Sequence, residues 1–124
     1  MAEKGLFCGM NKPADASNLT EPEKKHVPVI ECPDTVKAGE PFEVKVKVGS
    51  IPHVMDEGHS IQWIELFSGE NFLTRIDLTP VFTKAEVTVT LVKAGKHRKS
   101  ILRAVERCNL HGQWEATREI TVNE

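Results

Sequence analysis

Apolar and polar residues alternate with a period of two over several stretches of this chain. In residues 42–48 the apolar positions are Phe42, Val44, Val46 and Val48, and the intervening residues are charged. Residues 86–91 repeat the pattern with Val87, Val89 and Leu91. Because successive side chains of a β-strand point to opposite faces, this pattern predicts strands with one buried face. Runs of strand-forming residues predict further strands at 27–32, 61–67, 72–78, 100–106 and 115–122.

Turn-forming residues separate the predicted strands, and no long amphipathic helical pattern interrupts them. Pro33-Asp34, Ser68-Gly69 and Lys93-Ala94-Gly95 are examples. Seven short strands with this spacing are typical of an all-β fold, an immunoglobulin-like antiparallel β-sandwich or barrel. Residues 1–24 contain few large apolar residues, so we expect an extended N-terminal arm with at most one short turn of helix. A single domain is expected over residues 25–124.

Size and charge narrow the class of function. The chain has 124 residues, enough for one domain with a hydrophobic core, and a formal net charge of −2. Because Lys and Arg are not in concentrated excess, we expect neither a nucleic-acid surface nor a membrane-binding patch. The first residues lack the apolar stretch of a secretory signal, and the three cysteines are widely spaced, as in proteins of a reducing compartment. The expected location is the cytoplasm.

Four histidines and one cysteine are candidate metal ligands. Cys108 and His111 share one short segment, His53 and His59 share another, and His26 precedes the first predicted strand. On a sandwich all five fall in loops, where side chains from distant segments can converge. Thiolate combined with imidazole favours zinc, copper or iron over magnesium or calcium. Any one histidine could be a solvated surface residue, but the combination predicts a metal site.

Four segments carry a resemblance to a known family. They are Glu23-Lys24-Lys25-His26-Val27-Pro28-Val29-Ile30, Ile51-Pro52-His53, Gly58-His59-Ser60-Ile61-Gln62-Trp63-Ile64-Glu65-Leu66 and Cys108-Asn109-Leu110-His111-Gly112-Gln113-Trp114. In this order they resemble the motifs of superoxide reductases of the one-iron neelaredoxin type, which are related to the iron-centre II domain of desulfoferrodoxin. The resemblance spans roughly residues 23–122.

The resemblance implies one mononuclear non-haem iron per chain, with an open sixth coordination position. Its equatorial ligands would be His26, His53, His59 and His111, and its axial ligand Cys108. Superoxide would take one electron from ferrous iron and two protons, and leave as hydrogen peroxide. Neutral imidazoles leave such a centre cationic and attractive to an anion, and a thiolate donates electron density through the metal.

Residues beside the ligands have implied roles as well. Lys25 matches a family lysine near the open face, where its charge would steer superoxide. The family usually has a glutamate two residues before the first histidine, but Lys24 stands there and Glu23 precedes it. In an extended segment this offset turns the side chain to the opposite side, so either the arm bulges and Glu23 still reaches the sixth position of ferric iron, or water or hydroxide closes the site instead. We favour the second alternative. Backbone N–H groups of Leu110 and His111 are expected to donate toward the sulfur.

The remaining cysteines and the last histidine are interpreted as non-ligands. Cys32 ends an apolar strand, Cys8 is a thiol of the arm, and His97 lies among cations that would repel a metal ion. The four-cysteine iron site of two-iron relatives therefore cannot form. The resemblance implies an external electron donor, rubredoxin or a similar small redox protein, and a homotetramer.

Other classes of protein are weaker interpretations of the same residues. A cupredoxin-type electron-transfer protein usually needs a weak axial ligand after its last histidine, often methionine, and none follows His111. A structural zinc domain prefers four closed ligands with more thiolates. A dismutase would release oxygen as well as peroxide, and only Cys108 together with the family resemblance favours a reductase.

Overall fold

The computed structural model describes residues 9–94 and 99–124, so the predictions for Cys8 and His97 lie outside the described residues. Within these ranges the chain has one short helix and nine strands. They are β1 (Met10–Asn11), α1 (Glu21–His26), β2 (Pro28–Glu31), β3 (Thr35–Lys37), β4 (Phe42–Val48), β5 (Ile61–Ser68), β6 (Asn71–Asp77), β7 (Glu86–Leu91), β8 (Lys99–Cys108) and β9 (Gly112–Asn123). The predicted all-β class is confirmed.

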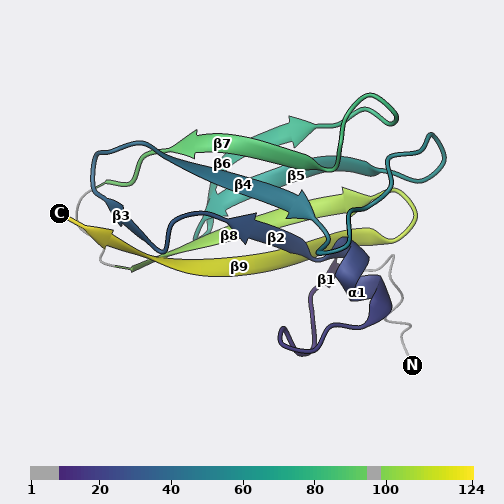
Figure 1. The fold of residues 1–124 in the computed structure, drawn as a ribbon, viewed down its shortest axis with the longest axis horizontal. Helices are drawn as coiled ribbons and strands as arrows, with labels where there is room; N and C mark the ends of the chain where they lie inside the picture. The colour runs from purple at the N-terminus through teal and green to yellow at the C-terminus, as the bar shows by residue number, and fades with distance from the viewer. Residues whose placement is uncertain (1–8, 95–98) are drawn as a thin grey trace.

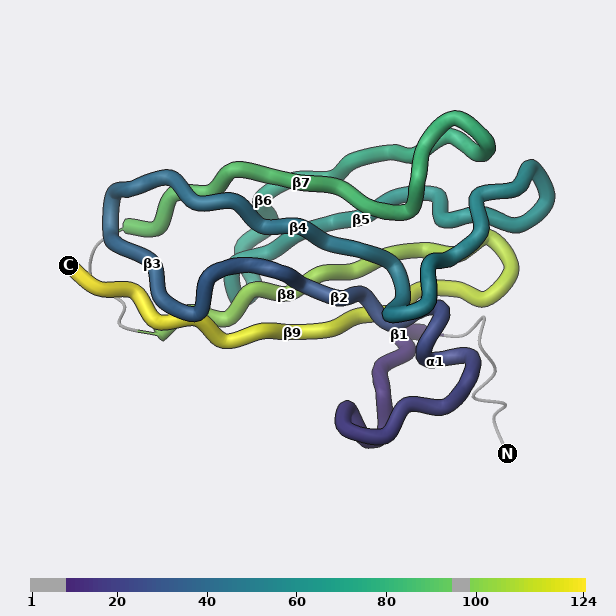
Figure 2. The backbone as a smooth tube through the Cα atoms, in the orientation of Figure 1, coloured from purple at the N-terminus to yellow at the C-terminus, as the bar shows by residue number. Residues whose placement is uncertain are grey.

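The strands form two layers, as Figure 1 and Figure 2 show. One sheet has six strands in the order β1-β9-β8-β5-β6, with β3 also paired to β9. The other has three strands in the order β2-β4-β7. Pairs among β2, β4, β5, β6, β7, β8 and β9 are antiparallel. The described chain is therefore a β-sandwich, as the sequence predicted.

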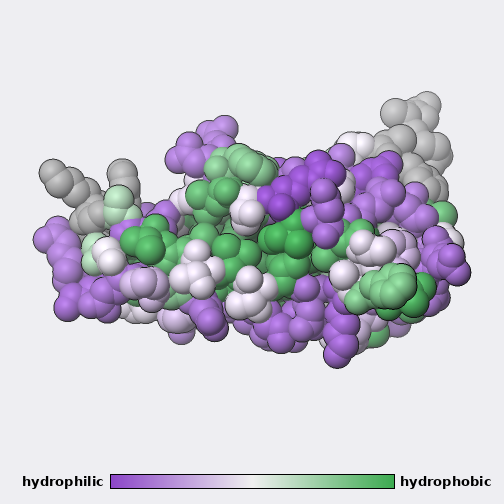
Figure 3. All heavy atoms as spheres, turned by 90° about the horizontal axis from the view of Figure 1, so that it is seen from above, coloured by the Kyte–Doolittle hydropathy of each residue, from purple (hydrophilic) through white to green (hydrophobic). Residues whose placement is uncertain are grey.

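The core lies between the two sheets and follows the period-two pattern. Val44, Val46 and Val48 of β4 are at most 1% exposed, and Leu102 and Ala104 of β8 face them with no exposure. Figure 3 shows apolar side chains along the middle of one long face, between polar groups. Half-buried residues that pack against the core include Leu78, Val87, Val89 and Leu91.

The structure corrects the predicted elements in three places. Strands β1 and β3 were not predicted, and both pair in parallel with β9. The expected arm allowed one short turn of helix, and α1 is a helix of six residues that includes the segment before His26, which had been treated as extended in interpreting the Glu23 offset. The strand predicted at 100–106 continues to Cys108, so this candidate ligand lies at a strand end rather than in a loop. No helix in the described ranges has the length and apolar character to cross a membrane.

Candidate metal centre

Three separate parts of the chain bring the candidate ligands to one end of the sandwich (Figure 1). His26 is the last residue of α1, His53 and His59 lie in the loop between β4 and β5, and Cys108 ends β8. His111 lies in the turn that connects β8 to β9. All five had been expected in loops, but His26 and Cys108 terminate regular elements, which fixes their backbones more firmly.

Helix α1 begins with a capping box. The amide of Thr20 donates to Glu23 Oε1 at 2.8 Å, and the amide of Glu23 donates to Thr20 Oγ1 at 3.4 Å. Pro22 in the first turn suits a helix start because its missing N–H has no partner to lose there. This Thr-x-x-Glu signal is visible in the sequence and was missed. Because the Glu23 carboxylate accepts the Thr20 amide, it is held at the first turn of α1.

The turn after β4 holds the end of α1. The amide of Ile51 and the hydroxyl of Ser50 donate to the carbonyl of Lys24, at 3.0 and 3.3 Å. Gly49 has φ +86°, and a Cβ there would lie 2.8 Å from the carbonyl oxygens of Lys24 and Lys25 and still closer to that of Ile51. Only glycine permits both this conformation and this approach. The contact fixes His26 relative to the loop that carries His53.

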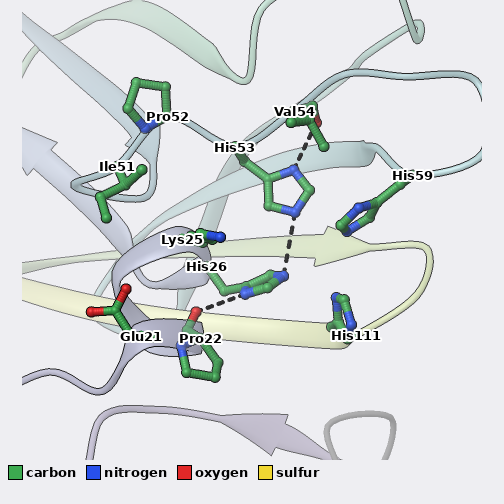
Figure 4. Close-up of a pocket in the computed structure, with 10 residues that line it drawn as sticks. All are labelled: Glu21, Pro22, Lys25, His26, Ile51, Pro52, His53, Val54, His59 and His111. Carbon is green, nitrogen blue, oxygen red and sulfur yellow. Dashed lines mark hydrogen bonds between the residues drawn. The ribbon is translucent and has the colours of Figure 1, made fainter.

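The four imidazoles form a ring in the order His26, His53, His59, His111 (Figure 4). Centroids of neighbouring rings are 4.7–5.1 Å apart, and their planes are inclined by 65–83°. The Nε2 atoms of His26 and His53 are 3.3 Å apart. Four edge-to-face imidazoles around one centre are suited to share one ion.

The sulfur of Cys108 lies against this ring. It is 3.6 Å from His53 Nε2 and 3.6 Å from His111 Nδ1, and these two histidines occupy opposite corners. Ligand atoms of His26, His59, Cys108 and His111 all lie within 4.8 Å of one another. The structure thus brings all five predicted ligands together.

Hydrogen bonds at the back of the rings prepare them for a metal. The Nδ1 atoms of His26 and His53 each lie 2.7 Å from a backbone carbonyl, of Pro22 and Val54 respectively. A carbonyl only accepts, so both Nδ1 atoms carry the proton and both Nε2 lone pairs face inward. His59 Nε2 is buried and has no hydrogen-bond partner within the described residues. A metal ion is the partner that these three nitrogens fit.

Burial favours the uncharged form of the ligands. It lowers the pKa of His26 and His111, and it lowers the pKa of His53 to about 4. These rings are therefore neutral near pH 7, as metal ligands must be. Burial raises the pKa of the Cys108 thiol, while N–H groups of Leu110 and His111 that donate to the sulfur act in the opposite direction. The prediction of these two donors is confirmed.

A cavity of about 600 Å³ opens over the histidine ring. All four imidazoles line it, whereas Cys108 is fully buried and does not. Lys25 and Glu21 stand at its margin (Figure 4), but Glu23 is not among the lining residues. A small molecule can therefore approach the ring from the side away from the sulfur, past a lysine.

Comparison with known proteins agrees with this geometry. The Desulfoferrodoxin family matches residues 18–117. The chain belongs to this family. A Methanocaldococcus jannaschii protein, itself only provisionally named a superoxide reductase, is 50% identical over 115 residues, which are 92% of this chain and 95% of that protein. The superoxide reductase of Pyrococcus furiosus is 35% identical over 74% of this chain and 85% of its own. The solved superoxide reductase (neelaredoxin) of Ignicoccus hospitalis has a TM-score of 0.77 at 38% identity, covering 95% of this chain and 96% of its own.

Two buried residues of this desulfoferrodoxin-family site were missed by the sequence reasoning. Trp114 stacks on His26 with centroids 5.1 Å apart, and its Nε1 donates to the carbonyl of His111 at 3.1 Å. Glu106 is fully buried on the core face of β8, two positions before Cys108. The signal for Glu106 was present, because an acidic residue occupied an inward position of a predicted strand.

Proposed function

We infer that this protein is a superoxide reductase that converts superoxide, one electron and two protons into hydrogen peroxide. One mononuclear iron would be held by His26, His53, His59, His111 and Cys108. The observation that carries this conclusion is the ring of four imidazoles with a buried sulfur on one side and a cavity on the other. A closed structural zinc site would leave no such approach.

The surrounding residues prepare the site for an anion. When bound, the iron supplies the electron that reduces superoxide. Neutral His26 and His53 add no negative charge, so a cation at the centre of the ring keeps most of its charge. Lys25 is exposed at the margin of the cavity, where its ammonium attracts superoxide from solution. We propose that this attraction is its role in the reaction.

Glu23 is not proposed as a ligand of the resting ferric site. Its carboxylate accepts the Thr20 amide at 2.8 Å, and reaching the ring would cost α1 its capping box. Solvent in the cavity is the better candidate for that position. A Glu23→Gln variant should keep the absorption spectrum of the oxidised protein, and a changed spectrum would return Glu23 to the site.

The electron is proposed to come from another protein, rubredoxin or a similar small redox carrier. Within residues 9–94 and 99–124 only one cluster of side chains that could hold a metal ion is found, so the described residues offer no second metal-based redox centre. By likeness to the family we also propose a homotetramer in the cytoplasm. The unpaired thiols of Cys32 and Cys108 are compatible with a reducing compartment.

The test is to feed superoxide to iron-loaded protein with a reductant while following oxygen and peroxide. A reductase forms a peroxide for every superoxide consumed and releases no oxygen. Stoichiometric oxygen would indicate a dismutase, and lack of consumption would favour a cupredoxin-type carrier. Cys108→Ser should abolish turnover, whereas Cys32→Ser, at a half-buried thiol outside the histidine ring, should keep it. Full turnover in Cys108→Ser would contradict the proposal.

A further inference from the structure

We propose that Asn109 is a positioning residue that holds His59 in register with Cys108. This inference rests on the proposed function, because it concerns how the iron site is kept assembled. Asn109 directly follows Cys108 and is partly buried in the turn between β8 and β9. Its side chain points across to the loop that carries His59, as its hydrogen bonds establish.

Asn109 makes three hydrogen bonds that bracket His59. Its Oδ1 accepts the amide of Ser60 at 2.9 Å, and its Nδ2 donates to the carbonyl of Gly58 at 3.1 Å. Its own amide donates to the carbonyl of Ser60 at 3.1 Å. The residues before and after His59 are thus both tied to the residue next to the cysteine ligand. Neither ligand segment can shift without breaking these bonds.

His59 depends on such support more than two of the other histidines. The rings of His26 and His53 are fixed by hydrogen bonds from Nδ1 to backbone carbonyls, whereas no hydrogen bond to either nitrogen of the His59 ring is found within the described residues. The loop before it is open to solvent, since Asp56 and Gly58 are exposed. An exposed loop is held by its hydrogen bonds rather than by packing. The Asn109 side chain therefore limits where the His59 ring can lie.

The chemistry of the contact explains why asparagine is suited to this position. One side-chain atom must accept from an N–H while the other donates to a carbonyl, and an amide does both. Aspartate has the same shape, but its carboxylate cannot donate to the Gly58 carbonyl and would face it with a negative charge. Alanine makes neither bond. The variants Asn109→Asp and Asn109→Ala thus remove one and two of the three contacts.

The experiment compares iron binding and spectra of these variants with a matched asparagine. Asn11→Ala is the control, because Asn11 Nδ2 also donates to a backbone carbonyl, that of Gln113 at 2.9 Å, which is neither a candidate ligand nor next to one in the sequence. Each protein is loaded with ferrous iron, and affinity is measured by competition with a chelator. We expect Asn109→Ala to bind iron about 10- to 100-fold more weakly, the usual effect of losing support behind a metal ligand. Asn109→Asp should lie between Asn109→Ala and the unchanged protein.

Two further readouts separate positioning from general destabilisation. The sulfur-to-iron absorption of the oxidised protein should change in both Asn109 variants and stay unchanged in Asn11→Ala. Amide exchange at Ser60 should accelerate in Asn109→Ala, because its acceptor is gone. If Asn109→Ala does not fold, the iron affinity and absorption spectrum of Asn109→Asp alone test the inference. Folded variants with unchanged affinity and spectrum would overturn the inference, whereas failure of the unmodified protein to bind iron would overturn the proposed function itself.

Discussion

Replacing Glu106 by Gln should stabilise the metal-free protein at neutral pH, by an amount that grows as the pH rises. Glu106 has no exposed surface, and both carboxylate oxygens lack a hydrogen-bond partner within the described residues. Burial raises the pKa of this carboxyl to about 9, from an ordinary value of 4.5. The folded protein therefore keeps a proton over a range in which the unfolded chain releases it.

The size of the effect follows from proton linkage. A group with a raised folded pKa contributes its full stability below pH 4.5 and loses it progressively as the pH approaches 9. Each pH unit in this window costs the folded state about 1.4 kcal/mol. Glutamine has nearly the same shape and does not titrate. The free energies of unfolding of the variant and the unchanged protein should be equal near pH 4.5, and that of the variant should be about 3 kcal/mol higher at pH 7.

The assay is urea unfolding of both metal-free proteins at several pH values. Comparing the two proteins at each pH cancels the titration of the histidines, which is common to both. Glu119→Gln, at an exposed carboxylate of β9 paired with Lys99 at 3.3 Å, controls for the loss of one surface charge and should show little pH-dependent difference. A pH-independent difference for Glu106→Gln would refute the reasoning, because it would mean that Glu106 is ionised inside the fold.

Three other changes test the site and its supports. Lys25→Ala should lower the second-order rate constant for superoxide by about tenfold at low ionic strength, with little loss at high salt. The control Lys24→Ala should have a smaller effect. Equal rate constants for Lys25→Ala and the unchanged protein at all salt concentrations would exclude steering by Lys25. Burial lowers the pKa of His53 to about 4, so the free energy of unfolding of the metal-free protein should fall as the pH is lowered from 6.5 toward 4. In urea unfolding, His53→Gln should lose about 1–3 kcal/mol less of this free energy over the same range. An equal loss in both proteins would contradict the prediction. Gly49→Ala should lower the free energy of unfolding by more than about 2 kcal/mol, because the positive φ is strained and the new Cβ would clash with the carbonyl oxygens of Ile51, Lys24 and Lys25. Gly39→Ala shares only the positive φ, with nothing within 4 Å, so an equal loss in the two variants would remove these clashes from the argument.

The strands and the candidate ligands could be predicted because each is marked by a local pattern or residue type in the sequence. Alternation in residues 42–48 and 86–91 gave β4 and β7 with their observed bounds. The candidate ligands were identified by residue type, since histidine has no packing reason to lie in loops and a cysteine stands three residues before one of these histidines. Strands β1 and β3 left no such mark. They have two and three residues, and each is defined by parallel pairing with β9, a contact between segments far apart in the sequence.

The supporting contacts could not be predicted for a related reason. Asn109 is a common turn residue in sequence, and only the fold places its amide beside Gly58 and Ser60. The inward position of Glu106 was readable from the predicted strand, but its raised pKa depends on complete burial between the sheets, which only the fold shows. Helix α1 is a different case, because Thr20 and Glu23 form the Thr-x-x-Glu pattern of a capping box, which can be recognised in the sequence. Treating that segment as extended was an error of interpretation rather than a limit of the sequence.

The shifted pKa values explain how one small domain can bury this many polar side chains before any metal binds. Isolated charges would be costly in this interior, and burial drives His26 and His53 toward the neutral form and Cys108 toward the thiol. Glu106, also protonated, adds no charge beneath them. In the metal-free protein these four side chains are therefore nearly uncharged, and the cost of burying them is limited to the hydrogen bonds that they do not make. A divalent cation then needs to displace chiefly the thiol proton of Cys108, so metal binding and ionisation of the sulfur become one coupled step.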